Sequence, residues 1–146
     1  MKVLFIGDII GRSGRATIKK VLPDLIKSKK IDLVIANGEN LAGGTGMTIE
    51  TYQEMLEVGI DYFTSGNHIW RKSDFVPYLD DKKIKVLRPL NYPEGVPGRG
   101  SANIKIKGIN ITIINLLGAT FMDEYIENPF HIIDEFLTNN KKIISF

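Results

Sequence analysis

Short, almost wholly apolar segments alternate along the chain with longer segments in which apolar residues recur every three or four positions. The short segments predict buried β-strands at 2–7, 31–36, 61–65 and 84–88. The longer segments predict helices at 13–29, from a cap at Thr48 or Thr51 through Val58, and around 72–80. Strands and helices that alternate in this way are typical of an α/β protein with a parallel sheet.

The predicted helix over 13–29 contains one residue that does not suit a helix interior. Its apolar face is formed by Ile18, Val21, Leu22, Leu25 and Ile26. Pro23 lies within the same segment and lacks the N–H group that a helix interior needs, so we expect a kink or a break there. The following helix is expected to end before Gly59, a typical C′ residue.

The pattern changes after a loop at 89–100 that is rich in proline and glycine. Residues 101–106 and 109–116 alternate apolar and polar positions around Lys107-Gly108, which predicts an antiparallel hairpin. Parallel and antiparallel strands are therefore both expected, in a mixed sheet.

A last helix is expected to begin at Asn128, because asparagine suits the N-cap and Pro129 suits the first helical position. Its buried stripe is expected to consist of Phe130, Ile133, Phe136 and Leu137. Residues 143–146 should begin one more strand. Since no repeat or linker interrupts the pattern, we expect a single domain over 1–146.

Composition narrows the class of protein. A chain of 146 residues can bury a core, and the lack of cysteine excludes disulfides, thiolate nucleophiles and cysteine-bound metals. A net charge of +2 with scattered lysines does not indicate a strong nucleic-acid surface.

Asp8 and Arg12 interrupt the first apolar run, and no later segment is long enough to span a membrane. The lack of cysteine fits a reducing compartment, so we expect a cytoplasmic protein.

Polar residues follow three of the predicted strands at the point where each strand ends. They stand in the segments Gly7-Asp8, Asn37-Gly38-Glu39-Asn40 and Gly66-Asn67-His68. Because the carboxyl ends of parallel strands lie at one edge of a sheet, these side chains are expected to converge in one crevice. Carboxylate, amide and imidazole groups can hold divalent cations, so the pattern favours a metal site.

Each of these residues also has a simpler interpretation. Asp8 could merely cap a turn, and the glycines of 7–14 match neither the dinucleotide nor the phosphate-loop spacing. Glu39 could serve a helix entry, but a carboxylate after a buried strand must be paired, desolvated or metal-bound, which favours metal. His68 could be a packed residue, a general acid, an oxyanion stabiliser or a ligand. His131 is interpreted as structural, and a solvated acidic face is expected at Asp123, Glu124 and Glu127.

Five segments carry a resemblance to a known family. Gly7-Asp8, Gly38-Glu39-Asn40 and Gly66-Asn67-His68 resemble the first three motifs of the calcineurin-like metallophosphoesterases. More narrowly, the chain is similar to the YmdB branch of bacterial phosphodiesterases in F-I-G-D-I-I-G, N-G-E-N, S-G-N-H-I-W, L-R-P-L-N-Y-P-E-G-V-P-G-R-G and I-N-L-L-G. The broad superfamily usually places a histidine two residues after the first aspartate. Ile10 fills that position here, as in the YmdB branch.

The resemblance implies a two-metal hydrolase of phosphodiesters. The expected substrates are 2′,3′-cyclic nucleotides, and the expected cofactors are two divalent metal ions, with iron or manganese favoured. Asp8 would hold the first metal, Glu39 would bridge, Asn40 would assist and Asn67 would hold the second. His68 would donate a proton to the leaving oxygen.

The family also implies ligands that this sequence does not contain. A histidine after the strand at 143–146 and two more from a later loop are expected in the family, yet the chain has only two histidines in total. The chain is therefore expected to be the N-terminal half of an α/β/β/α sandwich, apparently truncated, with an exposed sheet surface. It would then self-associate or bind a complementing C-terminal segment. The alternative to an active enzyme is an impaired fragment that acts as a metal-binding, anion-binding or interaction module.

Overall fold

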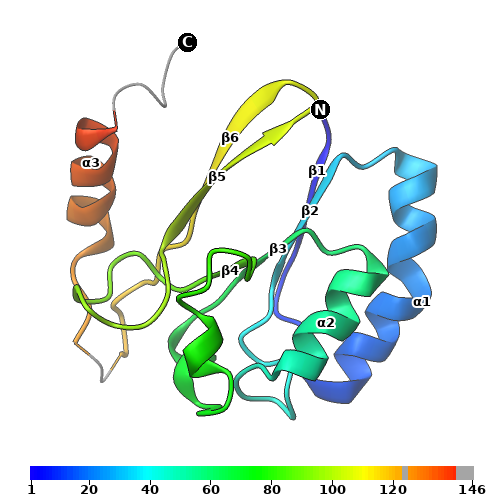
Figure 1. Cartoon of the computed structure of the whole chain (residues 1–146), viewed down its shortest axis with the longest axis horizontal. Coiled ribbons are helices and arrows are strands. Elements are labelled where there is room, and N and C mark those ends of the chain that lie inside the picture. The colour runs from blue at the N-terminus through cyan, green and yellow to red at the C-terminus, as the bar shows by residue number, and fades with distance from the viewer. Residues whose placement is uncertain (123–124, 141–146) are drawn as a thin grey trace.

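The computed structural model describes residues 1–122 and 125–140 of the chain. Its centre is a parallel sheet of four strands in the order β1-β2-β3-β4. The strands are β1 (Val3–Ile6), β2 (Leu33–Asn37), β3 (Tyr62–Thr64) and β4 (Val86–Leu87). Because all four run in the same direction, their carboxyl ends lie along one edge (Figure 1).

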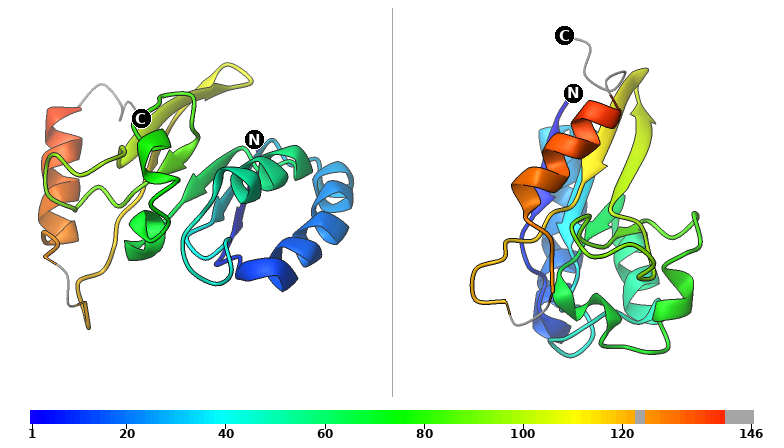
Figure 2. Two further views of the ribbon diagram at one scale, coloured as in Figure 1. Left: turned by 60° about the horizontal axis from the view of Figure 1, so that its bottom comes forward. Right: turned by 90° about the vertical axis from the view of Figure 1, so that its left-hand side faces the viewer.

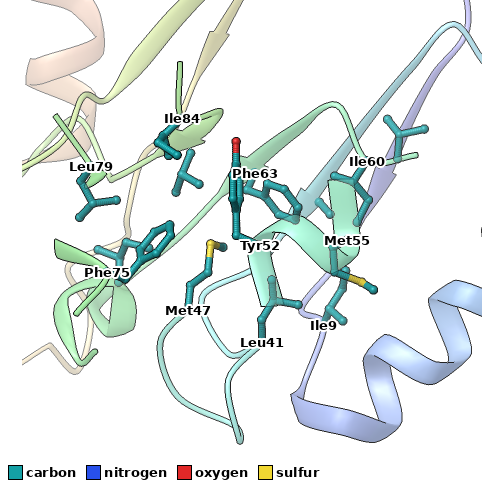
Figure 3. Close-up of a cluster of buried hydrophobic side chains, with 14 of the residues drawn as sticks. Ile9, Leu41, Met47, Tyr52, Met55, Ile60, Phe63, Phe75, Leu79 and Ile84 are labelled. Carbon is teal, nitrogen blue, oxygen red and sulfur yellow. The ribbon is translucent and has the colours of Figure 1, made fainter. Parts of the chain in front are cut away.

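Two helices cover one face of the parallel sheet (Figure 1). They are α1 (Gly11–Lys29) and α2 (Ile49–Val58). Figure 3 shows the core on this side, where Tyr52 and Met55 of α2 meet Phe63 of β3. The first half of the predicted βα alternation is therefore confirmed.

The predicted antiparallel hairpin is present as β5 (Ser101–Ile106) and β6 (Ile109–Ile114). Within the described residues it forms a two-stranded sheet of its own, so the parallel and antiparallel strands do not share one mixed sheet. A second apolar cluster joins the sheets, with Leu33, Ile35 and Leu87 packed against Ile113. The hairpin thus covers part of the parallel sheet's other face (Figure 2).

The far end of the hairpin is fastened to the start of β2. Lys107, in the turn between β5 and β6, forms an ion pair with Asp32, which also accepts a hydrogen bond from the backbone N–H of Lys2 at 2.7 Å. The hydrogen bond from Lys107 has the largest effect on the pKa of the Asp32 carboxyl, which both contacts lower. The carboxylate therefore stays ionised at neutral pH.

Pro23 does not break α1, which runs without interruption from Gly11 to Lys29. The predicted break is wrong because Pro23 lies on the exposed side of the helix. On that side, water can satisfy the carbonyl that loses its partner N–H group.

The helix expected around 72–80 is replaced by turns and one short 3₁₀ helix, η2 (Val76–Tyr78). Another 3₁₀ helix, η1 (Asn67–Trp70), precedes this segment. Pro77 lies at the start of η2 and has no N–H group for an α-helical bond to the preceding turn. The polar side chains of Ser73 and Asp74 also compete for local hydrogen bonds and disfavour a continuous helix.

Helix α3 (Pro129–Asn139) begins as predicted, with the Asn128 side chain accepting a hydrogen bond from the Phe130 N–H group. Its predicted buried stripe is wrong at Phe130, which is 76% exposed, and the other three positions, Ile133, Phe136 and Leu137, are half-buried. The helix borders an open groove of about 460 Å³ beside the loop after β4, to which it contributes Ile132 and Phe136. Neither apolar cluster of the described core contains a residue of α3, so its apolar side chains are only partly covered.

The strand expected at 143–146 and the acidic residues Asp123 and Glu124 lie outside the described residues. Glu127 is exposed, as expected for a solvated face. Among the helices of the described ranges, none combines the length and the apolar character that crossing a membrane requires.

Replacing Pro23 by alanine tests why α1 tolerates a proline. Pro23→Ala should raise the free energy of unfolding by about 1–2 kcal/mol, because the helix regains a backbone hydrogen bond. The gain is limited because the unfolded chain, without proline, is more flexible and so more stable. Urea denaturation measures the change. Lys20→Ala, at another exposed position of α1, is the control and should change stability by less than about 0.5 kcal/mol. A stabilisation of about 3 kcal/mol or more, the full cost of a proline in a helix interior, would contradict this explanation.

Candidate metal centre at the strand ends

The candidate site lies at the carboxyl edge of the parallel sheet. Asp8 follows β1, the pair Glu39-Asn40 follows β2, and the pair Asn67-His68 begins η1 just after β3. Each residue stands close to the point where the chain leaves the sheet, which is why the strands bring them to one edge. The sequence pattern predicted this edge from three separate segments.

A chain of hydrogen bonds connects three of these side chains. The Asn40 Nδ2 group donates to Asp8 Oδ2 at 2.8 Å, and Asn40 Oδ1 lies 2.7 Å from His68 Nδ1. An ionised carboxylate only accepts, so Asn40 must turn its NH₂ group to Asp8 and its oxygen to His68. His68 Nδ1 must therefore carry a proton, and Nε2 is the ring nitrogen that Asn40 does not engage.

Glu39 lies against the turn formed by Gly66, Asn67 and His68. Its Oε2 atom lies 3.5 Å from the backbone nitrogen of His68. The carboxylate also lies directly over Gly66, where an added Cβ would come within 2.2 Å of Oε2. A side chain at position 66 would therefore have to displace the Glu39 carboxylate.

The loop that carries Glu39 and Asn40 is held from several directions. The carbonyl of Asn40 accepts hydrogen bonds from the N–H groups of Gly11 at 2.9 Å and Gly44 at 3.2 Å. The carbonyl of the next residue, Leu41, accepts a hydrogen bond from the guanidinium of Arg15 on α1. Asn40 itself is 8% exposed, so its side chain has little freedom to leave this arrangement.

Arg15 is held in turn by an ion pair with Glu54 on α2, at 2.6 Å. Hydrogen bonds from Lys19 and then Arg15 lower the pKa of the Glu54 carboxyl, so it remains charged at neutral pH. The loop after β2 is therefore connected to both helices that cover the sheet. Nothing in the sequence pattern pointed to Arg15, because an arginine on a helix is usually solvated.

The remaining histidine lies away from this edge. His131 is exposed on α3, at the other side of the hairpin (Figure 1). Asn67, by contrast, is half-buried at the start of η1, immediately before His68.

The residues at this edge fit a metal ion only as part of a ligand shell. Two carboxylates, Asp8 and Glu39, and the side-chain amides of Asn40 and Asn67 offer the oxygen ligands that divalent cations take. However, the described ranges contain no group of three or more His, Cys, Asp and Glu side chains placed to hold a metal ion. In this structure the Asn40 oxygen is also directed at His68.

Parallel strands that end in carboxylate, amide and imidazole groups, packed against an antiparallel hairpin, place the chain in the metallophosphoesterase class of α/β folds. The YmdB-like protein family model matches residues 4–146, and the chain belongs to this family.

Known proteins of three organisms are similar to this chain. It is 39% identical over 142 residues to a 2′,3′-cyclic-nucleotide 2′-phosphodiesterase of Bacillus subtilis, covering 97% of this chain and 53% of the relative. A crystal structure of a hypothetical protein from Thermus thermophilus superposes with a TM-score of 0.88 at 37% identity, covering 96% of this chain and 54% of that one. A Mycoplasma pneumoniae protein described as a novel phosphatase superposes with a TM-score of 0.87 at 34% identity, covering 96% of this chain and 51% of that one.

The chain spans about half the length of the curated relatives that it matches. The family resemblance and the half-length match expected from the sequence are therefore both confirmed.

The contact between Glu39 and Gly66 can be tested by adding one methyl group. Gly66→Ala should lower the free energy of unfolding by about 1 kcal/mol, because the new Cβ must displace the flexible end of the Glu39 side chain. Denaturant unfolding measures the loss. Gly7→Ala is the matched control: a Cβ at position 7 meets nothing within 4 Å. In a Glu39→Ala background the Gly66→Ala cost should shrink, and an unchanged cost would show that the contact does not determine the glycine.

Proposed function

We propose that this chain forms the N-terminal part of the catalytic site of a metal-dependent phosphodiesterase. The observation that carries the proposal is the hydrogen-bonded series Asp8, Asn40 and His68, with Glu39 against the same turn. These groups combine oxygen ligands for a cation with an oriented imidazole, which is what phosphodiester hydrolysis requires. The name of the Bacillus subtilis relative supports 2′,3′-cyclic nucleotides as the substrate class.

Asp8, Glu39, Asn40 and Asn67 are the residues that would hold two divalent metal ions, with iron or manganese as the proposed metals. Such ions polarise a phosphoryl group and lower the pKa of water, so that hydroxide becomes available at neutral pH. Asp8 would hold the first ion and Asn67 the second. Glu39, which lies over the turn that begins η1, would reach both.

His68 would act as the proton donor to the leaving oxygen and not as a metal ligand. In its protonated form both ring nitrogens carry a proton, and Asn40 accepts the one on Nδ1. The proton on Nε2 can then pass to the leaving oxygen, and the imidazole that remains is the neutral form that Asn40 already favours. The Asn40 contact thus orients the ring without consuming the transferable proton.

A second candidate function follows from the incomplete ligand shell among the described residues at this edge. The chain on its own would then bind metal or anions weakly and act as an interaction module. Metal content and turnover, measured on the same preparation, separate this function from catalysis.

Metal binding and catalysis should respond differently to two substitutions. The isolated chain should bind Mn²⁺ weakly, measured by calorimetric titration, and Glu39→Ala should remove that binding because it deletes a carboxylate ligand. His68→Ala should leave Mn²⁺ binding nearly unchanged. His131→Ala, which removes the exposed histidine, is the control and should match the wild type. Equal loss of metal in the Glu39 and His68 variants would mean that His68 is a ligand.

Turnover of 2′,3′-cyclic AMP gives the corresponding kinetic test. The isolated chain should hydrolyse it far more slowly than the full-length Bacillus subtilis relative, because its ligand shell is incomplete. In any preparation with measurable turnover, His68→Ala should reduce kcat by roughly 10²–10⁴-fold, the loss expected for a missing general acid. Hydrolysis at the rate of the relative, with two tightly bound metal ions, would contradict the proposed incompleteness.

We further propose that the uncovered part of the parallel sheet is a contact surface for a complementing segment or for a second copy of the chain. Val3 and Phe5, on the edge strand β1, are 47% and 58% exposed and point to the face that the hairpin only partly covers. Apolar residues on an open sheet edge favour association.

Sedimentation velocity can measure this association. Phe5→Gln should shift the chain toward the monomer, because it removes apolar surface from the sheet face. Phe130→Gln is the matched control, since Phe130 is 76% exposed but lies on α3. A wild-type protein that stays monomeric at high concentration, or equal effects of the two substitutions, would contradict association through β1.

A further inference from the structure

Two of the five segments that carry the family resemblance contain no residue of the candidate metal centre. They are the loop that begins with L-R-P-L-N-Y and the segment I-N-L-L-G. Each contains a buried asparagine, Asn91 with 0% exposure and Asn115 with 7%. Buried amides must be hydrogen-bonded, and their partners show what each asparagine holds in place.

Asn115, directly after β6, bonds to the ends of two strands of the other sheet. Its Nδ2 group donates to the carbonyl of Ser65 at 2.7 Å and to the carbonyl of Leu87 at 2.9 Å. The ladder between β3 and β4 has its last pair at Thr64 and Leu87. At the point where the two strands separate, the Asn115 amide therefore provides the hydrogen bonds that the strands no longer make to each other.

The backbone of Asn115 is fixed as well. Its N–H group donates to the carbonyl of Gly100 at 3.0 Å, and its carbonyl accepts from the N–H group of Leu90 at 2.7 Å. Both bonds go to the segment that connects β4 to β5, so the backbone from which the amide extends is held in place. Asn115 can therefore determine the position of the Ser65 carbonyl.

Ser65 immediately precedes the turn that contains His68. Gly66 lies under the Glu39 carboxylate, and the His68 N–H group points at the same carboxylate. The turn is thus held on one side by Glu39 and at its start by Asn115. From this geometry we infer that Asn115 is a positioning residue, which sets the orientation of the His68 ring against Asn40 by fixing the Ser65 carbonyl. The catalytic meaning of that orientation rests on the proposed function, but the orientation itself does not.

Nuclear magnetic resonance of the histidine rings tests this inference without measuring turnover. The chain has two histidines, so a sample with ¹⁵N-labelled histidine gives only two sets of ring signals. In the wild type, His68 should show a protonated Nδ1 in its neutral form, as the Asn40 contact requires. His131 is exposed and serves as an internal reference with averaged tautomers.

Asn115→Ala should move the His68 ring signals toward the averaged values of His131 and leave His131 unchanged. Asn91→Ala is the matched control. Its Nδ2 group also donates to two carbonyls, of Leu117 at 2.8 Å and Glu127 at 2.9 Å, but neither leads to His68. Asn91→Ala should therefore leave the His68 signals where they are, even though it removes a buried amide of the same kind.

Two results would overturn the inference. One is an unchanged His68 spectrum in folded Asn115→Ala, and the other is an equal shift in both variants, which would indicate general loosening. If Asn115→Ala does not fold, Asn115→Ser replaces it, because a serine hydroxyl is shorter and has one donor for the two carbonyls. Asn115→Ser should shift the His68 signals in the same direction, and unchanged signals would overturn the inference. Because no substrate or metal is present, the inference can fail while the proposed phosphodiesterase survives, and the reverse is also possible.

Discussion

A parallel sheet ends in backbone groups that no further strand can pair, and the edge that carries the candidate metal centre is built by satisfying them. The Asn115 amide takes up the carbonyls where β3 and β4 separate. The Asn40 carbonyl accepts hydrogen bonds from the N–H groups of Gly11, at the start of α1, and Gly44, in its own loop. In the described part of the chain, no buried side-chain nitrogen or oxygen lacks a partner. Buried polar groups are costly when unpaired, so this bonding also fixes where Glu39, Asn40 and His68 lie.

Much of the fold could be predicted from the sequence because its elements are governed by local rules. Alternating strand and helix patterns located the four parallel strands, and Lys107-Gly108 located the hairpin turn. The failures arose where tertiary context decides. The tolerance of Pro23 depends on which side of α1 faces solvent, and the exposure of Phe130 depends on what α3 packs against. The hydrophobic patterns of the parallel strands and of the hairpin likewise do not show that they form two separate sheets.

The candidate site was predictable to the level of residues but not of contacts. Polar groups at three strand ends could be found because strand direction brings them to one edge. That Asn40 lies between Asp8 and His68 could not be found, since it depends on the path of the loop. The support from Arg15 and Asn115 was also invisible, although Asn115 lies in a segment that carried the family resemblance. Such residues act through backbone carbonyls, which any residue type could supply.

The two sheets are fastened together at both ends, and the two fastenings differ in chemistry. Near the site, Asn115 uses an uncharged amide, whereas the far end depends on the Lys107–Asp32 ion pair. The folded state lowers the pKa of Asp32, so its stabilisation is present above the pKa of the unfolded chain and disappears as the pH falls through the folded value. Acid should therefore weaken the contact at the hairpin tip. The Asn115 amide does not titrate, so the contact that joins the sheets near the candidate site should not depend on pH in the same way.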